Sequence, residues 1–313
     1  MNFSDVKQWV IPEGDIKKVV DSNNRVIWER SGYFYVEDTS GITNTLTIKK
    51  ARTNAPTIEV FASTDTANWV SMGTTNTVGI TATIPANGKL YLKATAGNWG
   101  DYSGSGNNRI SASGRHNVGG NIMSLLYGDE FEGKGIDQTT TSTFSTLFLG
   151  NTNLVNACDL VMPADELVDA CYNGMFEGCT SLITPPELPA TKLVSRCYGE
   201  MFAECTSLAT APALPATTLY YQCYIQMFSN CKALYNAPVL PATKLAGSCY
   251  LRMFYNCPIS RIVTYAQDIS ASRCTENWLE GVNYKGNFYN LGGATYTSGT
   301  SGIPAGWTEH NSL

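Results

Sequence analysis

Cysteine is the residue type in this sequence with the most evident capacity for chemistry, and its spacing is regular. All ten cysteines lie between Cys158 and Cys274, and eight of them form two series in which each step is 26 residues. The first series is Cys171, Cys197, Cys223 and Cys249, and the second is Cys179, Cys205, Cys231 and Cys257. Such residues could form disulfides, bind a metal ion or act as nucleophiles.

Each of these chemistries sets a requirement that the spacing does not meet. Paired cysteines of the two series are eight residues apart, about 12 Å along a helix, whereas a disulfide needs Cα atoms within about 7 Å. Equivalent helices of neighbouring units would lie about 8–10 Å apart. There is no Cys-x-x-Cys pair, and His116 and His310 are the only histidines. We therefore expect free, buried cysteines and no metal or other cofactor.

The cysteines belong to a longer repeated unit, Cys-Tyr-x-x-Met-Phe-x-x-Cys, followed by Leu-Pro-Ala-Thr from residues 188, 214 and 240. Positions that are the same in every unit should be those that stack one unit on the next. We expect the repeated tyrosines to be structural for the same reason. The predicted core of the repeat is Cys171, Met175, Cys179, Cys197, Met201, Cys205, Cys223, Met227, Cys231, Cys249, Met253 and Cys257.

A period of 26 residues lies in the range of leucine-rich-repeat coils, which have one strand and one helical or irregular segment per turn. Leu193, Cys197 and Met201 are spaced four apart, which predicts a helix capped by Thr191, and by Thr217 and Thr243 in the later units. Short strands are expected at 182–184, 208–210 and 234–236. The sequence thus predicts an α/β solenoid over residues 158–282, with a C-terminal β cap at 283–313.

The first 157 residues contain no cysteine and read as β structure. Residues 1–31 contain "KKVVDSNNRVIW", two β-prone runs around an Asx-rich turn, which predicts a hairpin. This segment has too few apolar residues to fold alone, so it should pack on its own chain or dock on another protein. The candidate docking residues are Trp9, Ile11, Ile16, Val19, Val26 and Trp28.

Residues 32–120 alternate in short runs rich in Thr, Val, Ile and Tyr, which predicts a β-sandwich. Residues 121–157 are expected to form a connector and an N-terminal cap. Within the sandwich, the Gly- and Asn-rich stretch 97–120 is predicted to be a loop that exposes Trp99 and Tyr102. These two aromatics are candidates for surface recognition.

Recognition within the array is expected where the units differ. Val194-Ser195-Arg196 corresponds to Tyr220-Tyr221-Gln222 in the next unit, and Ile183 corresponds to Ala209 and Tyr235. Tyr220, Tyr221 and Tyr235 are therefore the candidate recognition residues of the array.

Composition argues against several classes of partner. The formal net charge is −5 and no Lys/Arg run occurs, so we expect no nucleic-acid partner. No apolar run approaches the length of a membrane span, and the start of the sequence has no basic and apolar export pattern. We expect a chain that does not insert into membranes and is not exported.

The repeated unit resembles the BspA-type leucine-rich repeats of surface proteins from Bacteroides and its relatives, over about half of the chain. The order of hairpin module, β-sandwich and repeats is similar to that of fibre or appendage proteins of bacteriophages that infect Bacteroides. This resemblance implies a virion protein, a head or tail fibre subunit assembled in the host cytoplasm. It also implies an N-terminus that docks on other virion proteins, self-association as a trimer or dimer, and repeats that engage a host-surface glycan or protein.

Two alternatives remain open at this point. One is a bacterial surface adhesin with the same repeats. The other is a glycan-cleaving enzyme, which would need two carboxylates about 5–10 Å apart in a cleft. The acidic clusters available are Glu37-Asp38 and Asp129-Glu130-Glu132. Both are expected to be turn or linker charges, so we do not expect an enzyme.

Overall fold

The computed structural model describes residues 18–20, 26–29, 32–100, 106–162 and 167–313, in two compact parts, Met1–Gly32 and Tyr33–Leu313. In the N-terminal part, β1 (Lys18–Val20) pairs antiparallel with β2 (Val26–Glu29), and Val19 lies opposite Trp28. This is the hairpin that the sequence predicts. Trp9, Ile11 and Ile16 lie outside the described residues, and the docking role of this segment stays a prediction.

Strands provide most of the regular structure of the main part, in several sheets of which none closes on itself. The only helical segments among the described residues are α1 (Ser124–Tyr127) and the 3-10 turn η2 (Gly128–Glu130). The strands are β3 (Tyr35–Asp38), β4 (Asn44–Lys50), β5 (Glu59–Ser63), β6 (Val70–Thr74), β7 (Ile80–Ile84), β8 (Lys89–Ala94), β9 (Asn108–Ala112), β10 (His116–Asn121), β11 (Leu154–Val161), β12 (Val239–Leu240), β13 (Arg261–Thr264), β14 (Gly286–Asn290) and β15 (Trp307–His310).

Two sheets face each other in the first half of the main part. One has the strand order β11-β10-β3-β8-β5-β6 and the other β7-β4-β9. Alternate residues of each strand point into the space between them, where Val36, Leu46, Val60 and Leu92 are fully buried. The arrangement is the layered β structure that the alternating residues of this region indicate.

The stretch 97–120 is not a loop, because it contains β9 and most of β10. Each of its strands has a single β-branched residue, Ile110 or Val118, among Asn, Gly and Ser, so the composition misled the prediction. Glycine is required at one of these positions: a Cβ on Gly119 would lie 2.3 Å from Oη of Tyr35 on the neighbouring strand. The Gly-rich composition here reflects close packing.

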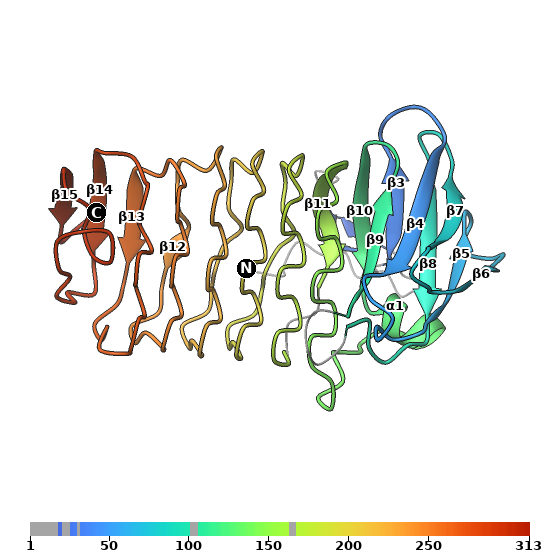
Figure 1. The fold of residues 1–313 in the computed structure, drawn as a ribbon, viewed down its shortest axis with the longest axis horizontal. Helices are drawn as coiled ribbons and strands as arrows, with labels where there is room; N and C mark the ends of the chain where they lie inside the picture. The colour runs from blue at the N-terminus through green and yellow to red at the C-terminus, as the bar shows by residue number, and fades with distance from the viewer. Residues whose placement is uncertain (1–17, 21–25, 30–31, 101–105, 163–166) are drawn as a thin grey trace. The chain divides into compact units, whose positions relative to one another are not determined.

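The predicted connector 121–157 contains α1, η2 and turns, and its last residues belong to the sheet. β11 pairs in parallel with β10, and Asn156 of β11 bridges to Thr184 in the first repeated unit. The buried apolar residues form one continuous cluster from Phe34 to Trp307. A bridge therefore joins the large sheet to the repeated units, which lie side by side (Figure 1), and the last two units supply β12 and β13 of the sheet β12-β13-β14-β15.

The repeated region divides into four units: unit 1 is residues 171–196, unit 2 is 197–222, unit 3 is 223–248 and unit 4 is 249–274. The helix predicted in each unit is absent, and Thr191, Thr217 and Thr243 cap nothing. The Cys-Tyr-x-x-Met-Phe-x-x-Cys segment is a run of turns instead. A spacing of four between apolar residues suits both an α-helix and this run of turns, so the spacing alone did not distinguish them.

The backbone amides of these turns alternate between two kinds of partner. The amide of Met175 donates to the carbonyl of Tyr172, three residues earlier, whereas the amide of Tyr172 donates to Cys197 of unit 2 at 3.1 Å. The same alternation runs through residues 170–179 and recurs at 196–205 and 222–231, so every second amide bonds to the carbonyl 25 residues later. These bonds join each unit to the next along the whole segment.

A left-handed residue recurs every fourth position, because the chain must turn back after each pair of residues. The backbone φ is +60° at Gly174, +55° at Glu200, +51° at Gln226 and +52° at Arg252, with a matching residue four positions later in each unit. Two side chains point inward and the next two point outward. The repeated Cys-Tyr and Met-Phe pairs are the inward ones, and they are fully buried or nearly so.

The inward side chains form columns that cross the units. Rings from Phe144 through the repeated tyrosines to Trp278 and Tyr296 stack 5.9–6.1 Å apart, and a parallel column of phenylalanines has spacings of 5.2–6.2 Å. Such ring contacts add to the energy of apolar burial. The second cysteine of each unit has a further role, because its thiol donates to a phenylalanine carbonyl of the preceding unit, as from Cys205 to Phe176 at 3.1 Å.

The extended segment of each unit lies later than predicted. Among residues 182–184, 208–210 and 234–236, only Thr184 makes a bridge, whereas β12 lies at Val239–Leu240 in the Pro-rich segment. Prolines occupy this segment in units 1, 2 and 3 and have no amide proton to donate, so regular strand pairing cannot form throughout it in these units. Single bridges at Lys192, Thr218, Lys244 and Asp268 join the units just beyond it.

The left-handed positions give a first prediction. Arg252 is exposed at φ +52°, where a β-branched side chain is strained. Arg252→Val should therefore have a free energy of unfolding about 1–2 kcal/mol below that of Arg252→Gly, measured by urea denaturation. The same pair at exposed Lys232, whose φ is not positive, should not show this order; equal stability of the two Arg252 variants would contradict the left-handed conformation.

The buried thiols give a second prediction. Nine of the ten cysteines are buried, and only Cys158 is exposed. Burial raises the pKa of Cys197 and of Cys249 to about 12, which suppresses the reactive thiolate. In native protein a thiol reagent should modify Cys158 and leave the others until urea unfolds the chain. The Cys158→Ser variant should lose the native reaction, and ready labelling of several cysteines in that variant would contradict the buried core.

Candidate functional site

The structure separates the five residues predicted to take part in surface recognition. Trp99 is 1% exposed, so its prediction as a surface residue is wrong. Its indole nitrogen donates to the carbonyl of Leu125 at 2.7 Å, which fixes the ring beneath α1. Tyr102 lies outside the described residues. Tyr220, Tyr221 and Tyr235 are exposed, at 59%, 49% and 58%.

Tyr220 and Tyr221 form a protruding pair at the end of unit 2, directly before the turn segment of unit 3. Their counterparts in the neighbouring units are small, with Ala246 and Gly247 on one side. A Cβ on Gly247 would lie 3.4 Å from the ring of Tyr221, so the ring rests over this glycine. The two phenol groups are thus accessible to a partner, because the equivalent side chains of the neighbouring units are smaller and project less.

Tyr235 lies on a different surface, which we call the proline face. It is the outward side of the segments 183–191, 209–217, 235–243 and 261–265, and exposed and buried residues alternate along the later part of the first three. Its exposed large apolar side chains are Ile183, Tyr235, Val239 and Tyr265. Soluble proteins rarely expose a contiguous apolar patch without a use for it.

A hollow of about 350 Å³ opens on the proline face between units 1 and 2. Five proline rings, Leu188, Ala213 and the carboxylate of Glu187 line it. No backbone hydrogen bond joins residues 185–190 to 211–216, both of which lie in the described part of the chain. The missing proline amides explain this gap, because the two segments cannot pair as strands.

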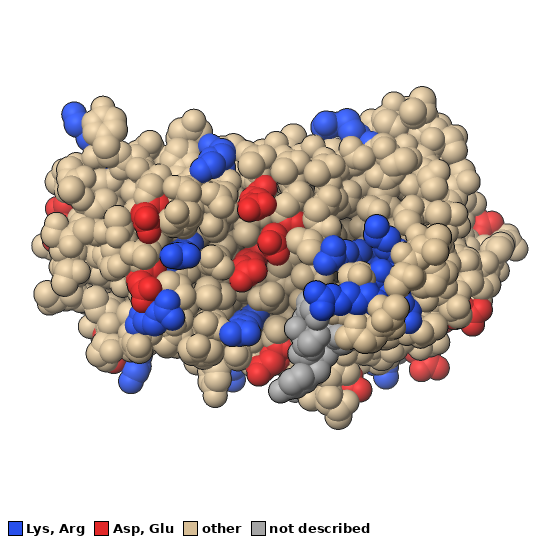
Figure 2. Space-filling model, viewed as in Figure 1, with Lys and Arg blue, Asp and Glu red and all other residues tan. Residues whose placement is uncertain are grey.

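The turn segments present a polar surface. On the face drawn in Figure 2, acidic side chains gather over the middle of the stacked units. Glu177 is partly buried, and burial together with the charges of Glu200 and Glu204 raises its pKa to about 7 against the opposing effect of Arg109. A like-charge group next to a partly buried carboxylate favours the protonated form.

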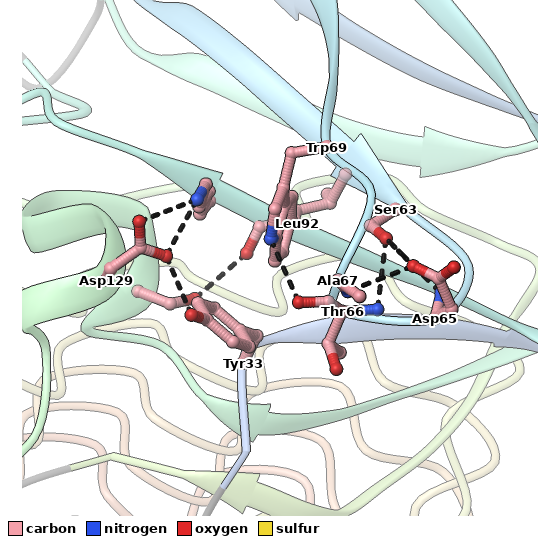
Figure 3. A network of polar contacts seen from close by, with 10 residues as sticks. Tyr33, Ser63, Asp65, Thr66, Ala67, Trp69, Leu92 and Asp129 are labelled. Carbon is pink, nitrogen blue, oxygen red and sulfur yellow. Dashed lines mark hydrogen bonds and ion pairs between the residues drawn. The ribbon is translucent and has the colours of Figure 1, made fainter.

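A second aromatic cluster lies on the sandwich, and the sequence did not single it out. The ring of Tyr33 meets the edge of Trp69 at 4.8 Å, and the Nζ of Lys93 lies 4.3 Å from the Trp69 ring centre (Figure 3). Asp129 accepts hydrogen bonds from Tyr33 Oη and Lys93 Nζ, both at 2.7 Å. Burial, and then the bond to Asp129, raises the pKa of Tyr33 to about 12.

This cluster combines partly exposed rings with a fixed cation and a fixed carboxylate. Asp65 orders the turn before Trp69 by accepting bonds from the amides of Ala67 and Asn68 (Figure 3). The residues that meet here are up to 96 positions apart, so only the strand order could have brought them together in a prediction. The sequence feature that could have pointed to this cluster was an aromatic residue, Trp69, directly after an Asx turn.

The acidic clusters considered for glycan cleavage have structural partners. Asp38 is buried and accepts bonds from Asn44 and from the amides of Ser40, Gly41 and Asn87. Although burial acts against it, the bond from the Ser40 hydroxyl and those from the amides of Asn87, Ser40 and Gly41 lower the pKa of Asp38 to about 2. Its neighbour Glu37 lies near Lys89 at 4.0 Å. Within the described ranges, no group of three or more His, Cys, Asp or Glu side chains is placed to hold a metal ion.

The chain matches no protein-family model, no curated protein and no solved structure. None of the helices in the described part of the chain is long and apolar enough to span a bilayer.

The pKa of Glu177 gives a third prediction. Because its folded pKa of about 7 exceeds the ordinary value of 4.5, the folded state binds this proton more tightly than the unfolded chain. Its contribution to stability is complete below about pH 4.5 and is lost as the pH rises through 7. Glu177→Gln should therefore flatten the fall in unfolding free energy between these values, measured by urea denaturation at a series of pH values. Glu130→Gln, at an exposed position outside the cluster, serves as the control, and an unchanged slope for Glu177→Gln would contradict the assignment.

Proposed function

We propose that this protein is a structural and attachment protein, a fibre or appendage subunit of a virion, in which the 26-residue units form a leucine-rich-repeat-like solenoid. One observation carries the proposal. The Cys-Tyr, Met-Phe and second Cys positions, which are identical in all four units, are buried in the columns, and the most exposed large side chains of the units, Ile183, Tyr220, Tyr221 and Tyr235, stand at positions that differ between units. This division suits a scaffold that is built by repetition and carries recognition on its variable surface.

The N-terminal part supports the structural half of the proposal. Its hairpin is a compact part distinct from residues 33–313, as a docking module would be. In this proposal residues 1–31 attach the chain to other virion proteins, and the main part is presented to the host. The resemblance to fibre proteins of Bacteroides phages points to the same orientation.

The protruding pair Tyr220-Tyr221 is the proposed recognition site for a host-surface glycan or protein. Tyrosine supplies a large, rigid contact area with a polar tip, and it is enriched among residues that dominate binding energy. The Tyr33-Trp69 cluster offers a second platform of the same chemistry on the sandwich. Repeated weak sites on an assembled fibre would bind strongly through multivalency.

The proposal gives a fourth prediction. Full-length protein should bind intact Bacteroides host cells and their isolated capsular polysaccharide, measured by cell pull-down and by surface immobilisation of the polysaccharide. The Tyr220→Ala/Tyr221→Ala variant should lose at least about tenfold in bound protein, as expected when a residue that contributes about 1.4 kcal/mol or more is removed.

The control is Tyr284→Ala, which removes a tyrosine that is 79% exposed and lies outside the four units. Binding by the control but not by the double variant supports the site. Equal binding by both variants would overturn the assignment of Tyr220 and Tyr221, and no binding by the wild-type protein to any host cell or polysaccharide would overturn the attachment function.

A further inference from the structure

We propose that the proline face binds the proline face of a second copy of this chain, with the two sets of units antiparallel and related by a two-fold axis. This inference goes beyond the attachment role and does not depend on the receptor. Three features of the face support it: its apolar surface, the placement of its projections and its hollow, and the placement of its two charges.

The surface chemistry fits an apolar protein partner. In the segments 183–191, 209–217, 235–243 and 261–265, Glu187 and Arg261 are the only charged residues. Large apolar side chains are exposed in the same segments: Ile183 by 50%, Tyr235 by 58% and Val239 by 47%. The prolines remove backbone donors that a glycan, rich in hydroxyl groups, would use. Burial of such a face against another apolar face is favourable.

The shape of the face is complementary to itself. Unit 3 carries the projections, Tyr235 and Val239, whereas the outward positions of unit 2 are alanines at 209, 211 and 213. The hollow lies between units 1 and 2. A two-fold axis that exchanges unit 2 with unit 3 places the projections of each copy over the alanines and the hollow of the other.

The charges are complementary in the same arrangement. The axis also exchanges unit 1 with unit 4, so Glu187 of one copy comes within side-chain reach of Arg261 of the other. Neither residue has an ion-pair partner among the described residues. Arg261 is held over the ring of Tyr289 at 4.9 Å, which orients its guanidinium at this end of the face. An isologous contact of this kind closes as a dimer and does not extend into a filament.

Sedimentation equilibrium of the full-length protein tests the proposal. Wild-type protein should be a dimer, and Tyr235→Asp and Val239→Asp should each raise the dissociation constant at least tenfold. The control Val78→Asp changes a residue that is 90% exposed on the sandwich and should leave the dimer intact. Unchanged thermal unfolding at monomer concentrations verifies that the variants are folded. A monomeric wild-type protein, or a dimer insensitive to both substitutions, would overturn the proposal.

Two further measurements test the antiparallel arrangement. Glu187→Arg and Arg261→Glu should each weaken the dimer, and the double variant should restore it. In a Cys158→Ser background, the Glu187→Cys/Arg261→Cys variant should form a covalent dimer with a short bifunctional thiol reagent that spans the reach of the two original side chains, whereas Glu187→Cys alone should not. A dimer that forms no such cross-link would show that the copies meet in another arrangement and would overturn the two-fold geometry.

Discussion

Alternate backbone amides in the turn segments bond to the neighbouring unit, and the rest of the array depends on this pattern. Tyr172 donates to Cys197, Tyr198 to Cys223 and Tyr224 to Cys249, each over 25 residues. The intervening amides close local turns, so the donors of these segments are satisfied without a helix. Because a turn is closed within every four residues, a left-handed residue is needed at every fourth position. The pattern of two side chains inward and two outward follows from that geometry.

The spacing set by the backbone explains which residues are constant. Side chains at equivalent positions stack directly, and identical rings fill equal spaces at about 6 Å. Cysteine is small enough for the remaining space and its thiol can donate to a carbonyl of the preceding unit, as from Cys231 to Phe202 at 3.1 Å. An alanine at this position has no thiol, so the phenylalanine carbonyl oxygen would lose this hydrogen-bond donor. The residues that look reactive in the sequence therefore have structural roles, and the outward positions are free to vary.

Sequence reasoning predicted what depends on burial and on local alternation. It located the hairpin, the layered strands and the buried positions of the units, and it identified Tyr220, Tyr221 and Tyr235, which are exposed. It failed where an α-helix and a run of turns place their inward side chains at the same sequence spacing. The four-residue step of Leu193, Cys197 and Met201 fits a helix equally well, and only the left-handed residues at Arg196 and Glu200 exclude it.

Long-range contacts account for the other differences. Trp99 is buried because its amide bonds to Thr143 and its indole to Leu125, neither of which is near it in sequence. The cluster of Tyr33, Trp69, Lys93 and Asp129 likewise requires the strand order of the large sheet. The sequence shows the proline face only as the repeated Leu-Pro-Ala-Thr motif. The burial of individual residues in the structure identifies the side chains that point outward from it.

Amide hydrogen exchange tests the backbone pattern most directly. The amides of Tyr198, Phe202, Tyr224 and Phe228 each donate to the following unit, so they should exchange only when the chain unfolds globally. Protection that is equal to that of the neighbouring amides of Met201 and Met227 would agree with the alternating pattern. Rapid exchange at the first four amides, with protection at Met201 and Met227, would show that the units are not joined by their backbones and would contradict this account.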